Sequence, residues 1–130
     1  GYANPKQVKD LFDELYRTVG TDIAVGAHFH DTRGLGLANA YAAVEAGVRE
    51  LDSCLGGLGG CPYAPGASGN IVTEDLVFML EGMGLRTGID LDGLLEARQI
   101  MECHLKDEPT QGAFVSAGRP LGFEPASVAA

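Results

Sequence analysis

The chain alternates short apolar segments with segments whose apolar residues recur at helical spacing, and this alternation constrains the fold most. Residues 22–30 contain a nearly continuous apolar run, which is typical of a parallel strand covered on both faces. Residues 49–55 and 86–89 are expected to form two further strands. Since strands joined by helices pair in parallel with right-handed crossovers, the order predicts an α/β protein with about three parallel strands.

Helices are expected before, between and after these strands. The first begins at Pro5, where a missing amide hydrogen costs nothing; Asn4 caps it and Gly20 ends it. The others are predicted over residues 35–46, from Thr73 onwards and over residues 91–105. Glycine and proline are then scattered without periodicity, so residues 106–130 are expected to form an irregular tail.

Composition is typical of one globular domain, since 45% of the 130 residues are hydrophobic. The formal charge of -9 argues against binding to nucleic acid, which relies on basic surfaces. The sequence shows neither a run of membrane-spanning length nor the pattern of a secretory signal. Three cysteines do not suggest a disulfide framework. The expected location is therefore a reducing compartment, bacterial cytoplasm or mitochondrial matrix, with no membrane partner and no secretion.

Two histidines stand at the end of the first expected strand. Side chains two positions apart on a strand point to the same face, so His28 and His30 should face the same space. Two neutral imidazoles on one face can each give a metal ion a nitrogen ligand. The alternative is that both are simply hydrogen-bonded at a strand end.

A loop rich in glycine and proline, residues 57–70, holds Cys61. Glycine permits unusual backbone angles and proline stiffens turns, so such a loop can present a thiol without secondary structure. Asn70 at its end can add an amide oxygen to the two imidazoles. A surface loop with an incidental cysteine is the alternative.

Several segments carry a resemblance that covers nearly the whole chain to about residue 105. They are His28-Phe29-His30-Asp31-Thr32, Leu37-Ala38-Asn39, Gly57-Leu58-Gly59-Gly60-Cys61-Pro62-Tyr63, Gly66-Ala67-Ser68-Gly69-Asn70 and Thr73-Glu74-Asp75-Leu76. Together they resemble the 3-hydroxy-3-methylglutaryl-CoA lyases, a family of metal-dependent (β/α)8 TIM barrels. Because a complete barrel needs about 250 residues, the resemblance implies that residues 1–105 are its C-terminal half.

The resemblance also implies a reaction and a site. The reaction is the retro-Claisen cleavage of 3-hydroxy-3-methylglutaryl-CoA to acetyl-CoA and acetoacetate. His28, His30 and Asn70 correspond to metal ligands, and the divalent cation is expected to be Mg2+ or Mn2+, although the ligands alone leave zinc or cobalt open. Cys61 is the expected catalytic thiol, and His28 is the candidate to carry the hydroxyl proton.

The same resemblance points to what this chain lacks. The family's remaining metal-binding aspartate and the arginine beside it belong to its first strand, so the isolated chain is expected to be inactive. The complete enzyme is expected to bind an acyl-CoA substrate and to form a homo-oligomer, a dimer. Arg33 stands where relatives often carry an aromatic residue.

Other interpretations of the sequence stay open. The chain resembles the aldol-type or Claisen-type acyl-CoA synthases of the same superfamily around the histidines, but not in the cysteine loop. A nucleotide-binding module would use the glycines of residues 34–39 and Asp52 as the ribose acid. Asp31 either orients a histidine or caps a turn. Cys54 and Cys103 are expected to be inert packing residues.

Overall fold

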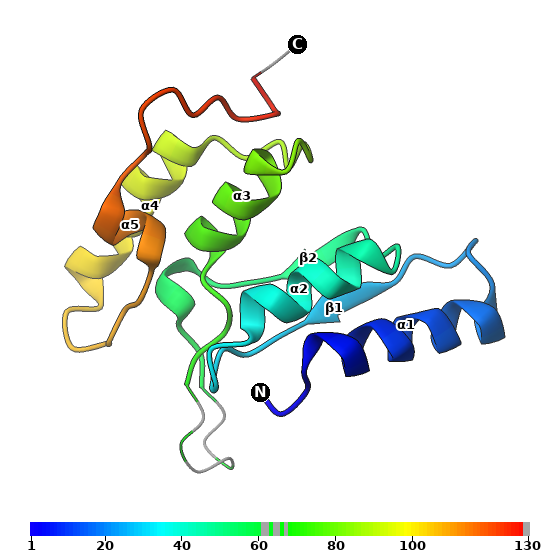
Figure 1. The fold of residues 1–130 in the computed structure, drawn as a ribbon. Helices are drawn as coiled ribbons and strands as arrows, with labels where there is room; N and C mark the ends of the chain where they lie inside the picture. The colour runs from blue at the N-terminus through cyan, green and yellow to red at the C-terminus, as the bar shows by residue number, and fades with distance from the viewer. Residues whose placement is uncertain (61–62, 64–65, 67, 129–130) are drawn as a thin grey trace. The chain divides into compact units, whose positions relative to one another are not determined.

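The computed structural model describes residues 1–60, 63, 66 and 68–128. The chain divides into two compact units. The first contains Gly1–Ser53 and Gly59–Ile71, and the second contains Cys54–Leu58 and Val72–Ala130. Figure 1 gives the order of the elements along the chain.

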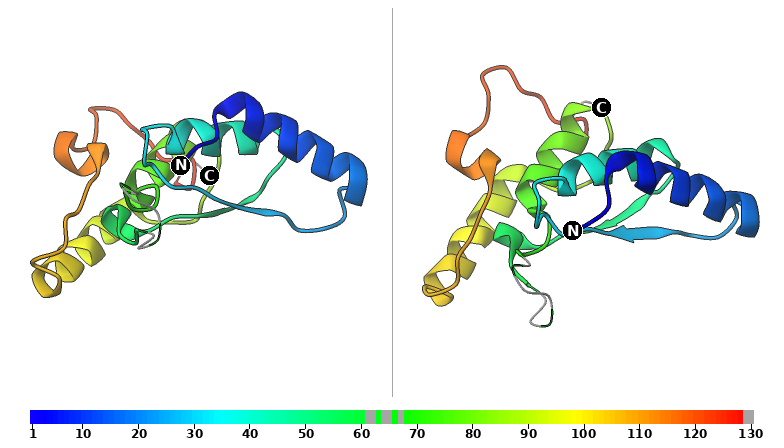
Figure 2. Two further views of the ribbon diagram at one scale, coloured as in Figure 1. Left: turned by 90° about the horizontal axis from the view of Figure 1, so that it is seen from below. Right: turned by 60° about the horizontal axis from the view of Figure 1, so that its bottom comes forward.

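The first unit is built from α1 (Pro5–Val19), β1 (Gly26–His28), α2 (Gly36–Glu45) and β2 (Glu50–Asp52). The two strands pair in parallel, with His28 opposite Asp52 at their C-terminal ends. The two helices lie side by side in both views of Figure 2. They share one core with β1, formed by Val8, Phe12, Ala27, Ala42, Ala43 and Val48.

The start of α1 follows the sequence prediction closely. Asn4 accepts a hydrogen bond from the Gln7 backbone, and the Gln7 side chain accepts one from the Asn4 backbone, which completes a capping box. Pro5 stands at the first helical position, and Gly20 ends the helix with a φ of 83°. The predicted helix over residues 5–19 is therefore confirmed.

The second unit is helical among its described residues. It contains a short 3-10 helix η1 (Leu55–Gly57), then α3 (Thr73–Gly82), α4 (Leu91–His104) and α5 (Ala113–Ala117). Val77, Leu91 and Phe114 form its core. The Phe78 ring lies 4.9 Å from that of Phe114 and 4.8 Å from that of Phe123. The tail that the sequence predicts to be irregular therefore contains a helix whose Phe114 is buried.

The predicted third strand is wrong, because residues 86–89 form no strand in the part of the chain that the structure describes. The backbone donors that a ladder would use go elsewhere. The Thr87 amide donates to Glu81 Oε1 at 2.7 Å, and the Gly88 amide donates to Ser127 Oγ at 3.0 Å. The described sheet therefore has two parallel strands instead of about three.

Cys103 is exposed, which corrects the expectation that it packs on the buried face of its helix. The buried residues of α4 are Leu91 and Arg98. Cys103 follows Arg98 by five residues and therefore points about 140° away from it around the helix axis. Cys54 is half-buried and pairs with Val72 through a single bridge. None of the described helices is long and apolar enough to cross a membrane.

Candidate functional site

The two histidine rings meet at the end of β1. Their centroids are 5.1 Å apart, and their planes are inclined at 60° in an edge-to-face arrangement. His28 is the last residue of the strand, and His30 follows after one residue. The alternation expected of a strand has therefore brought both imidazoles to the same space.

His30 is held by the end of the glycine-rich loop. The Asp31 amide donates to Gly69 O and the Ile71 amide donates to Phe29 O, each at 3.2 Å, so the loop end runs antiparallel to the residues around His30. His30 Nδ1 lies 3.2 Å from Ser68 O. Because a carbonyl oxygen only accepts, Nδ1 carries the proton, and Nε2 presents a lone pair. A fixed tautomer of this kind is what a metal-binding histidine needs.

His28 has a carboxylate beside it. Its Nδ1 lies 3.5 Å from Asp52 Oδ2, because the parallel register places the two residues opposite each other. From the sequence, Asp52 stands out only as a candidate ribose-binding acid. Residues at the ends of neighbouring parallel strands meet at one sheet edge, so the sequence does suggest that the two strand ends are close. Pairing His28 with Asp52 requires the exact strand register, however.

Asn70 forms an isolated antiparallel bridge with His30, and its side-chain oxygen Oδ1 is buried. Gly59 makes room for this side chain. A β-carbon built on Gly59 would lie 2.9 Å from Asn70 Nδ2, and the φ of Gly59 is 92°, a conformation that favours glycine. The structure therefore brings Asn70 next to His30, as a shared site requires.

Asp31 acts as a cap in this structure. Its Oδ1 accepts a hydrogen bond of 2.6 Å from the Gly36 amide at the start of α2. A β-carbon on Gly36 would lie 2.3 Å from Ile71 Cγ2, so this glycine serves close packing. Asn39 is buried and donates through Nδ2 to Ala3 O at 2.9 Å. The Gly36 amide and the Asn39 side chain therefore already have hydrogen-bond partners, which argues against a phosphate-binding loop here.

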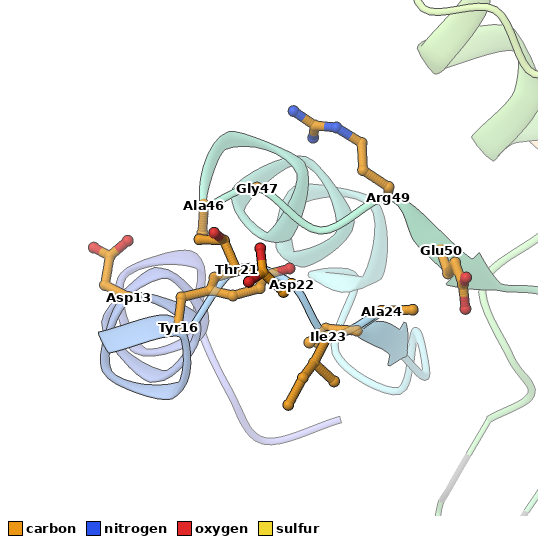
Figure 3. A pocket seen from close by; sticks show the side chains of 11 residues that line it. Asp13, Tyr16, Thr21, Asp22, Ile23, Ala24, Ala46, Gly47, Arg49 and Glu50 are labelled. Carbon is orange, nitrogen blue, oxygen red and sulfur yellow. The ribbon is translucent and has the colours of Figure 1, made fainter. Parts of the chain in front are cut away.

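Both imidazoles line a cleft of about 780 Å³ in the first unit, together with Asn39 and residues of α1. A second pocket, of about 440 Å³, lies in the same unit and is shown in Figure 3. It is lined by Asp13, Asp22 and Glu50 among others, and it contains neither histidine. Since ligands of parallel α/β folds bind at the carboxyl ends of strands, the cleft beside His28 is the candidate site.

Cys61 lies outside the described residues, while Tyr63 from the same loop is exposed. Arg33 stacks over the Tyr2 ring, 4.2 Å from its centroid, and donates to Gly1 O. Within the described part of the chain, no three His, Cys, Asp or Glu side chains come together as a possible metal centre. The donors available there are two imidazoles and the Asn70 amide.

The HMGL-like family model matches residues 1–101, most of the chain. The chain belongs to the HMGL-like family. It is 50% identical over 117 residues to the mitochondrial hydroxymethylglutaryl-CoA lyase of Homo sapiens, covering 90% of this chain and 35% of that protein. It is 47% identical over 96 residues to the hydroxymethylglutaryl-CoA lyase of Pseudomonas mevalonii, covering 74% of this chain and 32% of that protein.

A solved structure supports the same assignment. The HMG-CoA lyase of Acinetobacter baumannii, in complex with coenzyme A and 3-methylmalate, matches with a TM-score of 0.84 and 47% identity. The match covers 96% of this chain and 40% of that one. The predicted partial (β/α)8 barrel is confirmed by this likeness. The chain spans about a third of the length of the curated relatives it matches.

Proposed function

We propose that the complete protein, meaning this chain with the rest of its barrel, is a divalent-metal-dependent lyase. It cleaves 3-hydroxy-3-methylglutaryl-CoA to acetyl-CoA and acetoacetate. One observation carries the proposal: in a chain of the HMGL-like family, the ring of His28 contacts that of His30, and His30 is bridged to Asn70. We infer the substrate from the names of the relatives, which are hydroxymethylglutaryl-CoA lyases.

The donor set fits a divalent cation. His30 presents Nε2 because its Nδ1 is engaged by Ser68 O, and Asn70 brings a buried amide oxygen. The Nδ1 of His28 faces Asp52 Oδ2 at 3.5 Å, so His28 would offer Nε2 to the cation. All three donors are neutral, so they favour transition metals, and a hard cation such as Mg2+ needs a carboxylate from the rest of the barrel. We infer Mg2+ or Mn2+ from the family.

A cation held there would supply Lewis-acid polarisation and orientation of substrate oxygens. In the reaction the hydroxyl proton leaves, the carbon–carbon bond beside the hydroxyl-bearing carbon breaks, and the oxygen becomes the ketone of acetoacetate. The electron pair of the broken bond becomes the enolate of acetyl-CoA, which takes a proton at carbon. Protons and electrons balance without an oxidant or reductant.

The chain's own residues divide the proton transfers. His28 accepts the hydroxyl proton on Nε2 while Asp52 stabilises the imidazolium through Nδ1. The lone pair of that nitrogen would serve either the proton or a bound cation, never both at one moment. We propose that Cys61 donates the proton that quenches the enolate, because a thiol is a weak acid that can give a proton to carbon. We also propose that the complete protein is a dimer and that the isolated chain is inactive.

The test is an assay of the complete protein with 3-hydroxy-3-methylglutaryl-CoA and Mn2+ or Mg2+, with both products identified by mass spectrometry. The proposal expects metal-dependent release of acetoacetate and its loss after chelation or in His30→Ala. An unchanged rate in that variant, or turnover by the isolated chain, would overturn the site. Condensation of acetyl-CoA with a 2-oxo acid in place of cleavage would show a synthase.

A further inference from the structure

A closed ring of hydrogen bonds lies in the second unit, and four residues form it. The Gly56 amide donates to both carboxylate oxygens of Glu74, at 3.3 and 3.2 Å. Arg98 Nη1 donates to Glu74 Oε1 at 2.8 Å and to Gln111 O at 2.6 Å. The Gln111 amide donates back to Gly56 O at 2.8 Å. The amide and the carbonyl of Gly56 are therefore bound by Glu74 and Gln111, and Arg98 donates a hydrogen bond to each of these two residues.

The charges of this ring are buried. The side chain of Arg98 is 5% exposed and that of Glu74 is fully buried. Glu102 adds a second carboxylate, which accepts from Arg98 Nε at 2.9 Å and from Thr110 Oγ1 at 2.8 Å. Desolvation lowers the pKa of Arg98, but the hydrogen bonds to Glu74 and Glu102 outweigh it and the net pKa is raised. The guanidinium is thus a permanent cation whose Nε and Nη1 atoms both donate hydrogen bonds.

The ring has little room to move. A β-carbon on Gly56 would lie 2.9 Å from Thr110 Cβ, and the φ of Gly56 is 60°. A β-carbon on Gly112 would lie 2.9 Å from Arg98 Nη1. Both glycines therefore let backbone and guanidinium approach more closely than an alanine would allow.

Two residues of the ring, Gly56 and Glu74, flank residues 58–71 in the sequence. Cys54 O accepts from the Gly57 amide and from the Thr73 amide, each at 3.0 Å, and Cys54 is bridged to Val72. The two ends of residues 58–71 are thus joined at Cys54. That segment carries Asn70 and Cys61, the site residues outside the histidine strand.

We propose that Arg98 is a positioning residue for catalysis: it fixes both ends of residues 58–71 through Glu74, Gln111 and Gly56. This inference rests on the proposed function and adds a specific residue to it. Asn70 is also held by its bridge to His30. Loss of Arg98 should therefore lower turnover while metal affinity changes little.

The primary experiment compares Arg98→Met, Arg98→Lys and Arg119→Met in the complete protein. Arg119 forms an exposed ion pair with Asp92 in the same unit and is the matched control. We expect kcat to fall at least tenfold in Arg98→Met, with KM and the Kd of Mn2+ within threefold. Lysine can reach one acceptor but not three, so Arg98→Lys should recover only part of kcat. Arg119→Met should match the wild type.

Arg98→Met leaves the Glu74 carboxylate buried without a counter-charge and can fail to fold. The neutral pair Arg98→Met/Glu74→Gln removes that problem and keeps an acceptor for the Gly56 amide. We expect it to melt within a few degrees of the wild type, yet to lose at least tenfold in kcat because Gln111 O has lost its donor. A folded double variant whose kcat is within threefold of the wild type would overturn the proposal.

Alkylation by iodoacetamide gives a readout that does not need lyase activity. Mass spectrometry follows Cys61 and, as an internal control on the helix of Arg98, the exposed Cys103. We expect the double variant to raise the alkylation rate of Cys61 at least threefold and to leave that of Cys103 unchanged. An unchanged rate at Cys61 would contradict the positioning role. A complete protein that lacks lyase activity but shows this shift would refute the proposed function alone.

Discussion

His28 Nδ1 lies 3.5 Å from Asp52 Oδ2 because the parallel register pairs these residues at the ends of β1 and β2. Asp52 is also largely exposed, so the contact acts on the orientation of the imidazole more than on stability. A carboxylate that fixes a histidine ligand typically contributes a factor of about 10 to 100 in metal affinity or activity.

The first prediction follows from that contact. Asp52→Ala in the complete protein should lower kcat/KM or metal affinity by roughly 10-fold to 100-fold, because His28 loses the group that orients it. Glu50→Ala is the control, since Glu50 lies two residues earlier on the same strand and is also exposed. Steady-state kinetics and calorimetry with Mn2+ would measure both variants. Equal effects of the two substitutions would contradict the role of Asp52 in orienting His28.

The second prediction concerns the thiol. Cys61→Ser should cut turnover strongly, since a placed proton donor contributes about 100-fold to 10,000-fold. Metal affinity should stay nearly the same, because the thiol is not a ligand in this account. Cys103→Ser, on an exposed helix position, should behave as the wild type. Turnover within a few-fold of the wild type in Cys61→Ser would rule out its role.

A third prediction applies to the isolated chain. It holds the neutral donors His28 and His30 and should bind zinc, cobalt or manganese weakly, and magnesium hardly at all, without lyase activity. Calorimetry of each metal on the chain and on His30→Ala measures this. The control is His104→Ala, because His104 is exposed on α4 and its Nδ1 contacts Ile100 O. Tight magnesium binding, or binding that is indifferent to His30, would contradict it.

The fourth prediction concerns stability in acid. Glu81 is buried; desolvation raises its pKa, but hydrogen bonds from Ser127 and Thr87 prevail and lower it from 4.5 to about 2. A depressed folded-state pKa stabilises the fold above the unfolded pKa, and this stabilisation is lost as pH falls towards the folded value. The shift corresponds to about 3 kcal/mol at most.

Glu81→Gln should therefore lower the free energy of unfolding at pH 7, and the difference from the wild type should shrink between about pH 4.5 and pH 2. Urea unfolding at several pH values measures the difference. Glu108→Gln, at an exposed position of the same unit, is the control and should show no such dependence. A constant difference across this range would refute the assignment.

The parts of the fold that depend on local sequence could be predicted. The cap at Asn4, the helix from Thr73 and the pairing of two strand ends follow from short patterns. The strand over residues 86–89 could not be judged locally. Its backbone donor at Thr87 is taken by Glu81, a choice that depends on how α3 ends.

The candidate site divides in the same way. Alternation along one strand is enough to place His28 and His30 together, and the loop motif points to Asn70. The sequence does not reveal the contact of Asp52 with His28, which depends on strand register, or the Glu74–Arg98 pair, whose residues are 24 positions apart. Long-range pairs of this kind leave no periodic signal in the sequence.

We propose that His28 and His30 hold the metal with which the complete protein cleaves 3-hydroxy-3-methylglutaryl-CoA. Pulsed electron paramagnetic resonance of the Mn2+ form, labelled with 15N-histidine, tests it most directly when turnover is measured on the same sample. The account predicts coupling to imidazole nitrogen that weakens in His30→Ala together with turnover and persists in His104→Ala. Full cleavage activity without any imidazole coupling would contradict it.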